Sequence, residues 1–132
     1  MKKFLILLLL PIFLVAGCQK SSTETTIPTV PEVKKITAQE AKEFIDSGNV
    51  IILDVRSQEE YNTGHIKNAI LIPHTEVTSK IQAIITDKNA KILVYCASGI
   101  RSALAATDLI NLGYTDVSDF GAISGWSYGI IK

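Results

Sequence analysis

Short runs of consecutive apolar residues constrain the fold of this chain more than any other feature of its sequence. Residues 50–53, 69–72 and 92–95 are such runs. An uninterrupted apolar run of this length is typical of a strand that is covered on both faces. Segments with helical periodicity separate the runs, and residues 117–120 could form a last short strand. Strands that alternate with helices predict an α/β domain with a mainly parallel central sheet flanked by helices.

Two of the expected helices begin with a capping box, in which Ser or Thr is followed three residues later by Glu. The boxes are Thr37 with Glu40 and Ser57 with Glu60. In each box the two side chains satisfy backbone N–H groups at the start of the helix. Glycine, which favours the end of a helix, follows at positions 48 and 64.

Two further helices are indicated by the spacing of apolar residues. The first of them is marked by Val77, Ile81, Ile84 and Ile85, which would share one helix face. The second covers residues 102–112 and would end at Gly113. Each of these helices would connect two strands of the sheet.

The first seventeen residues have the composition of a secretion signal. Lys2 and Lys3 precede an apolar stretch, residues 4–15, that is shorter than the roughly 20 residues a membrane-spanning helix needs. The stretch runs into Leu-Val-Ala-Gly-Cys at positions 14–18, which resembles the lipobox of bacterial lipoproteins. The resemblance implies cleavage before Cys18 and attachment of lipid, including palmitate, to Cys18. The alternative is an ordinary signal peptide with a chance cysteine.

The rest of the chain is expected to form a tether and one domain. Residues 18–33 are rich in Ser, Thr and Pro and lack apolar periodicity, so we interpret them as a flexible tether. Residues 34–132 suffice for one small monomeric domain that buries a core without disulfides. A lipid anchor at Cys18 would hold this domain at a bacterial membrane, facing the periplasm or the cell surface. The chain has 13 basic and 13 acidic residues, which does not favour a nucleic-acid partner.

Cys96 is the residue at which reactive chemistry is most clearly indicated. It follows the apolar run 92–95 and opens a short loop that leads into a helix; the loop residues are Ala97, Ser98, Gly99, Ile100 and Arg101. A strand, a glycine-containing loop and a helix N-terminus together form a cradle of backbone N–H groups that stabilises an anion. A thiol in that cradle would be held as thiolate, its nucleophilic form. Ligands of parallel sheets bind beyond the carboxyl ends of the strands, where Cys96 lies.

Several short motifs occur in order around this loop. They are Asp-Val-Arg at 54–56, Gly-His-Ile at 64–66, Cys-x-x-Gly-x-Arg at 96–101, and Gly121 with Trp126. Together they resemble the rhodanese family of sulfurtransferases over residues 36–126. The resemblance implies a rhodanese-like domain in which Cys96 takes a sulfane sulfur from a small anionic donor such as thiosulfate. The resulting persulfide would pass the sulfur to a thiol acceptor or to cyanide, and no cofactor would be needed.

The same resemblance suggests roles for the surrounding residues. Residues 97–100 would bind substrate through backbone N–H groups, and Arg101 could pair with a sulfonate. Asp54 and Arg56 match family positions that line or brace the active-site face. A structural salt bridge of Arg56 with Glu59 or Glu60 is the simpler expectation. Two histidines and one free cysteine without ligand spacing predict no metal site.

The loop length separates this chemistry from its nearest alternatives. Four residues separate Cys96 from Arg101, whereas the similar loop of cysteine phosphatases is one residue longer, because a tetrahedral phosphate needs a wider ring of N–H donors. The sequence therefore favours sulfur transfer over a phosphatase or an arsenate reductase-like enzyme. Many rhodaneses have a basic residue directly after the catalytic cysteine, and Ala97 lacks that charge, so the donor stays open. A non-catalytic binding domain in which Cys96 is incidental is the alternative from a different functional class.

Overall fold

The computed structural model of the protein describes residue 17 and residues 29–132. Residues 1–16 of the predicted signal peptide lie outside the described part of the chain, as do Cys18 and most of the predicted tether. The strands are β1 (Lys34–Lys35), β2 (Val50–Asp54), β3 (Ile70–Leu71), β4 (Lys91–Cys96) and β5 (Asp116–Ala122). The helices are α1 (Ala38–Ser47), α2 (Gln58–Thr63), α3 (Val77–Ile84) and α4 (Ile100–Asn111), with short 3-10 helices at His74–Glu76 and Ile123–Gly125.

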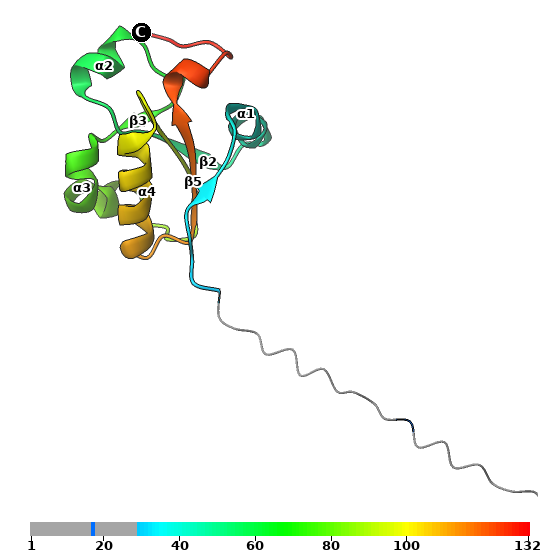
Figure 1. Cartoon of the computed structure of the whole chain (residues 1–132). Helices are drawn as coiled ribbons and strands as arrows, with labels where there is room; N and C mark the ends of the chain where they lie inside the picture. Colours follow the sequence, from blue (N-terminus) through cyan, green and yellow to red (C-terminus); the bar gives the residue numbers. More distant parts are fainter. Residues whose placement is uncertain (1–16, 18–28) are drawn as a thin grey trace, which may run out of the picture.

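The five strands form one parallel sheet in the order β1-β5-β4-β2-β3. Helices α3 and α4 pack on one face of this sheet and α1 packs on the other, as Figure 1 shows. The predicted α/β class with helices on a parallel sheet is therefore confirmed. Within residues 29–132 no helix is both long and apolar enough to cross a membrane.

Strand β4 lies in the centre of the sheet, and its side chains alternate between the two cores. Ile92, Val94 and Cys96 face the core under α3 and α4. Leu93 and Tyr95 face the core under α1. All five are fully buried, which explains why this segment reads as an uninterrupted apolar run.

Both predicted capping boxes are present. The Thr37 hydroxyl accepts a hydrogen bond from the Glu40 N–H, and the Ser57 hydroxyl accepts one from the Glu60 N–H. In both boxes the glutamate carboxylate accepts a hydrogen bond from the backbone N–H of the capping residue. These contacts fix where α1 and α2 begin.

The structure corrects three local expectations. The segment 69–72 forms only a two-residue strand, in which Ile70 and Leu71 are half-buried, whereas Ala69 and Ile72 on either side are buried as expected. Ile84 is exposed, whereas Val77, Ile81 and Ile85 enter the core. The last helix begins at Ile100 instead of residue 102, because Gly99 takes a left-handed conformation that turns the chain into the helix.

Candidate functional site

The loop after β4 lies at the carboxyl end of the central strand, as the sequence predicts. Cys96 is the last residue of β4, residues 97–99 form the turn, and Ile100 begins α4. The neighbouring strand β2 ends at Asp54, so the segment that carries Arg56 begins at the same, carboxyl-terminal end of the sheet. The predicted residues of the site are thus brought together at one edge.

Cys96 carries a free thiol that is surrounded by hydrogen-bond donors. Its side chain is fully buried, and the Gly99 N–H donates to Sγ at 3.0 Å. Burial raises the pKa of this thiol, but the neighbouring Ser102 hydroxyl and the N–H groups of Ser102, Gly99 and Ser98 outweigh the effect of burial and lower the pKa. The net effect favours the thiolate, the form that attacks sulfur.

Gly99 is required by the shape of this loop. Its φ of +93° is a conformation that other residues rarely adopt. A Cβ at this position would lie 3.6 Å from the Cα of Gly121, which belongs to the irregular part of β5. The loop therefore lies close to the backbone of β5, and with the left-handed turn at Gly99 its N–H donates to the sulfur at 3.0 Å.

Arg101 forms a bidentate ion pair with Glu60 of α2. Nη1 donates to Oε2 and Nη2 donates to Oε1, each at 2.7 Å. The hydrogen bonds from Arg101, followed by the one from the Ser57 N–H, lower the pKa of Glu60 to about 2. Glu60 thus closes the capping box of α2 and also holds the arginine of the Cys96 loop.

Asp54 and Arg56 form a second, buried pair. The Asp54 carboxylate accepts from Nη2 of Arg56 at 2.7 Å and from its Nε at 3.0 and 3.1 Å. Arg56 also donates to the Gly64 carbonyl at 2.8 Å, and the Tyr95 hydroxyl donates to Asp54 at 2.5 Å. The expected salt bridge of Arg56 with Glu59 or Glu60 is wrong, because the Asp54 carboxylate lies two residues away in the same buried layer. The network ties β2, β4 and the end of α2 together next to the candidate site.

Sequence reasoning missed three residues of the site: Glu60, Tyr95 and Ser102. The capping box of α2 already explained why a glutamate stands at position 60, so no second role was sought for it. Tyr95 was counted among the apolar residues of its strand. Ser102 was interpreted as the start of a helix, yet its hydroxyl lies near the thiol and hydrogen-bonds the Gly99 carbonyl at 3.1 Å. The signal that could have found Ser102 is its position on the first turn of the helix that follows Cys96.

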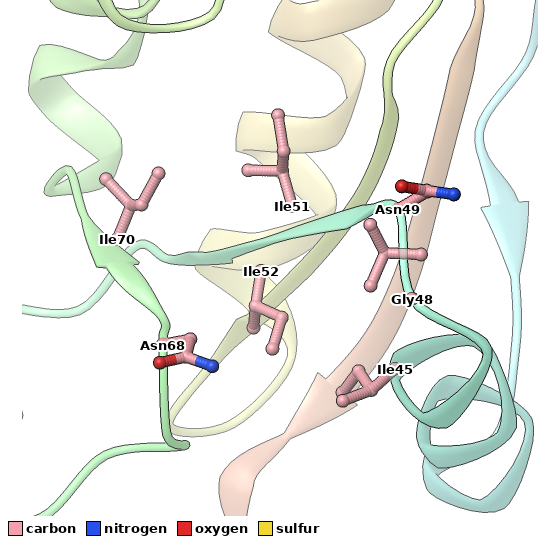
Figure 2. Close-up of a pocket in the computed structure, with 8 residues that line it drawn as sticks. Ile45, Gly48, Asn49, Ile51, Ile52, Asn68 and Ile70 are labelled. Carbon is pink, nitrogen blue, oxygen red and sulfur yellow. The ribbon is translucent and has the colours of Figure 1, made fainter.

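Two pockets lie near the sheet ends, and they differ in chemistry. One, of 440 Å³, includes Arg56, Gly64, Ile123 and Trp126 and opens at the same edge as the Cys96 loop. The other, of 320 Å³, lies beside the start of β2; Figure 2 shows Ile45, Ile52 and Asn68 around it. The residues that line the second pocket include no ionisable side chain. In the described part of the chain no three His, Cys, Asp or Glu residues gather as metal ligands.

Comparisons with known proteins agree with this architecture. The family model of the rhodanese-like domain matches residues 37–128. The thiosulfate sulfurtransferase PspE of Escherichia coli K12 is 39% identical over 71 residues, which cover 54% of this chain and 68% of that protein. The thiosulfate sulfurtransferase GlpE of Coxiella burnetii is 33% identical over 94 residues, which cover 70% of this chain and 86% of that protein. A solved structure of a rhodanese-related protein from Thermoplasma volcanium has a TM-score of 0.65 at 35% identity and covers 74% of this chain and 97% of that one.

The family match includes every residue of the Cys96 loop and both ion pairs described above. The similarity to the two curated relatives extends over more than two thirds of each of them. The chain therefore belongs to the rhodanese-like domain family.

Proposed function

We propose that this protein is a sulfurtransferase that carries a sulfane sulfur as a persulfide on Cys96. The observation that carries the proposal is the Gly99 N–H that donates to the Sγ of Cys96 at 3.0 Å; together with the neighbouring groups of Ser98 and Ser102 it lowers the pKa of the thiol. Two curated relatives bear the name thiosulfate sulfurtransferase. A thiolate in a fixed anion site needs no separate general base.

The transfer proceeds in two displacements. The Cys96 thiolate attacks the outer sulfur of a donor such as thiosulfate, the S–S bond of the donor breaks, and its electron pair leaves with sulfite. In the second step an acceptor thiolate attacks the outer sulfur of the persulfide, and the Cys96 thiolate is released. The N–H groups of Ser98, Gly99 and Ser102 stabilise negative charge at Cys96 in both steps.

The burial of Cys96 favours a second candidate function. Its side chain is fully buried, so Sγ presents no exposed surface to a donor in this conformation. A buried, inert thiol in a domain that binds a partner has the same appearance. The two functions differ in whether Cys96 accepts sulfur.

Sulfur loading distinguishes them. We expect the protein to gain one sulfur atom on Cys96 when it is incubated with thiosulfate or with a persulfide, as measured by intact mass and peptide mapping. Loading should already proceed below the ordinary thiol pKa of about 8.5, because the lowered pKa populates the thiolate there. A chain that takes up no sulfur from either donor, and makes no thiocyanate from cyanide, is not a sulfurtransferase.

We further propose that the domain is held at a bacterial membrane by lipid on Cys18, facing away from the cytoplasm. The lipobox-like segment at positions 14–18 supports this, and several acyl chains on one residue anchor stably where one chain binds only marginally. Substituting Cys18→Ala is expected to abolish incorporation of labelled palmitate and to release the protein from the membrane fraction. Equal labelling of the variant and the unaltered protein would rule out Cys18 as the lipid site.

A further inference from the structure

We propose that this site prefers an organic persulfide, R–S–SH, over dianionic thiosulfate as its sulfur donor. The proposal rests on the sulfur-transfer function above and specifies its substrate class. It follows from the charges that the fold leaves around the Cys96 loop.

The cation of the loop is already neutralised. Both terminal nitrogens of Arg101 donate to the two carboxylate oxygens of Glu60 at 2.7 Å, the end-on geometry of a strong ion pair. Glu60 is fixed in turn, because its Oε2 also accepts from the Ser57 N–H at 2.9 Å. A donor that approaches Cys96 therefore meets a pair without net charge.

The neutralised charge of Arg101 is not replaced by another free cation, either in the Cys96 loop or at Arg56. Arg56 is 4% exposed, and Asp54 neutralises it within the buried network. Position 97, directly after the nucleophile, carries alanine. The thiolate of Cys96 itself is negative, so two negative charges on thiosulfate would be brought against a third with little compensation.

The exposed surface beside the loop is apolar. Ile100, the first residue of α4, is 70% exposed, and Leu104, one helical turn further, is 55% exposed. Residues four apart on a helix share one face, so these side chains form an exposed apolar rim that begins where the Cys96 loop enters α4. Such a rim offers contacts to the carbon part of an organic persulfide and none to the sulfonate of thiosulfate.

The chemistry of the preferred donor balances without a further reactant. The Cys96 thiolate attacks the outer sulfur of R–S–SH, a new S–S bond forms at Sγ, and the R–S to SH bond breaks. The electron pair leaves on the RS⁻ thiolate, and the proton stays on the transferred sulfur. With thiosulfate the same displacement releases sulfite, but the thiolate must approach a dianion.

The test compares kcat/KM for cysteine persulfide and for thiosulfate in the unaltered protein, Glu60→Gln and Ala97→Lys. Gln can replace Glu in a capping box, so Glu60→Gln frees the charge of Arg101 while α2 keeps its start. We expect the unaltered protein to favour cysteine persulfide by about tenfold or more. Both variants should lower KM for thiosulfate by roughly two- to tenfold relative to KM for cysteine persulfide, so the ratio of the two KM values is the quantity compared.

Ionic strength and a matched variant provide the controls. The gain with thiosulfate should shrink as salt is added, because salt screens the attraction of a freed cation for the dianion. Glu59→Gln removes the same charge from the neighbouring residue, which does not pair with Arg101, and should not change the donor preference.

Preference of the unaltered protein for thiosulfate would overturn the proposal, as would an unchanged ratio of the two KM values in both Glu60→Gln and Ala97→Lys. If Glu60→Gln fails to fold, Ala97→Lys alone decides. Absence of sulfur transfer from either donor is a different result, since it contradicts the sulfurtransferase function itself.

Discussion

Sulfur transfer is expected to fall by about a thousandfold or more when Cys96 is replaced with serine. A serine hydroxyl is a far weaker nucleophile than a thiolate at neutral pH, and the cradle contains no histidine or carboxylate that contacts Sγ and could activate it. The N–H donors of the loop still favour a negative charge at position 96, but the serine hydroxyl stays protonated at neutral pH. The measurement is thiocyanate or persulfide formation per unit time with a saturating donor.

The loss of activity identifies Cys96 as the nucleophile only if the Cys96→Ser variant is folded. Serine can accept the Gly99 N–H that donates to Sγ, but it places a hydroxyl in an apolar core, which costs about 1–3 kcal/mol of unfolding free energy; urea unfolding of Cys96→Ser shows whether the variant stays folded under the assay conditions. Cys18→Ala, which alters the other cysteine of the chain, should retain full transfer in the detergent-extracted protein. Comparable turnover in Cys96→Ser would assign the reaction to another group.

A large loss of stability is expected from Asp54→Asn. The substitution keeps the side chain's size but removes the charge that neutralises Arg56, which is itself buried. Leaving one charge of a buried pair without its partner typically costs about 3–5 kcal/mol of unfolding free energy. The Tyr95 hydroxyl, which donates to Asp54 at 2.5 Å, also loses a charged acceptor. Urea unfolding followed by the fluorescence of Trp126, the single tryptophan, measures the change.

Asp46→Asn is the matched control for that experiment. Asp46 pairs with Lys42 one helical turn away, and its side chain is 61% exposed. Pairs of this kind contribute about 0.3–0.5 kcal/mol, so the control should change the urea midpoint only slightly. Equal effects of the two substitutions would show that the Asp54 network is not a structural brace.

Much of the fold could be predicted because it depends on local patterns. The apolar runs at 50–53 and 92–95 became the central strands β2 and β4, and both capping boxes formed where predicted. Periodicity and capping act over one or two turns of chain, so they can be read without knowing the tertiary structure. The edge position of β3 could not be predicted, because it depends on strand order and not on the composition of the strand.

The local arrangement of the candidate site could be predicted from the sequence alone: a strand, Cys96, a loop with Gly99, and a helix. That arrangement needs only neighbouring residues, and the structure has it at the carboxyl end of β4. The charged and polar partners around Cys96 depend on the folded arrangement of the chain and could not be predicted in this way. Glu60 reaches Arg101 across 41 residues of chain, and Tyr95 reaches Asp54 across 41. The physical reason is that β2 and β4 lie side by side as parallel partners, so charges distant in sequence meet at one edge and neutralise each other.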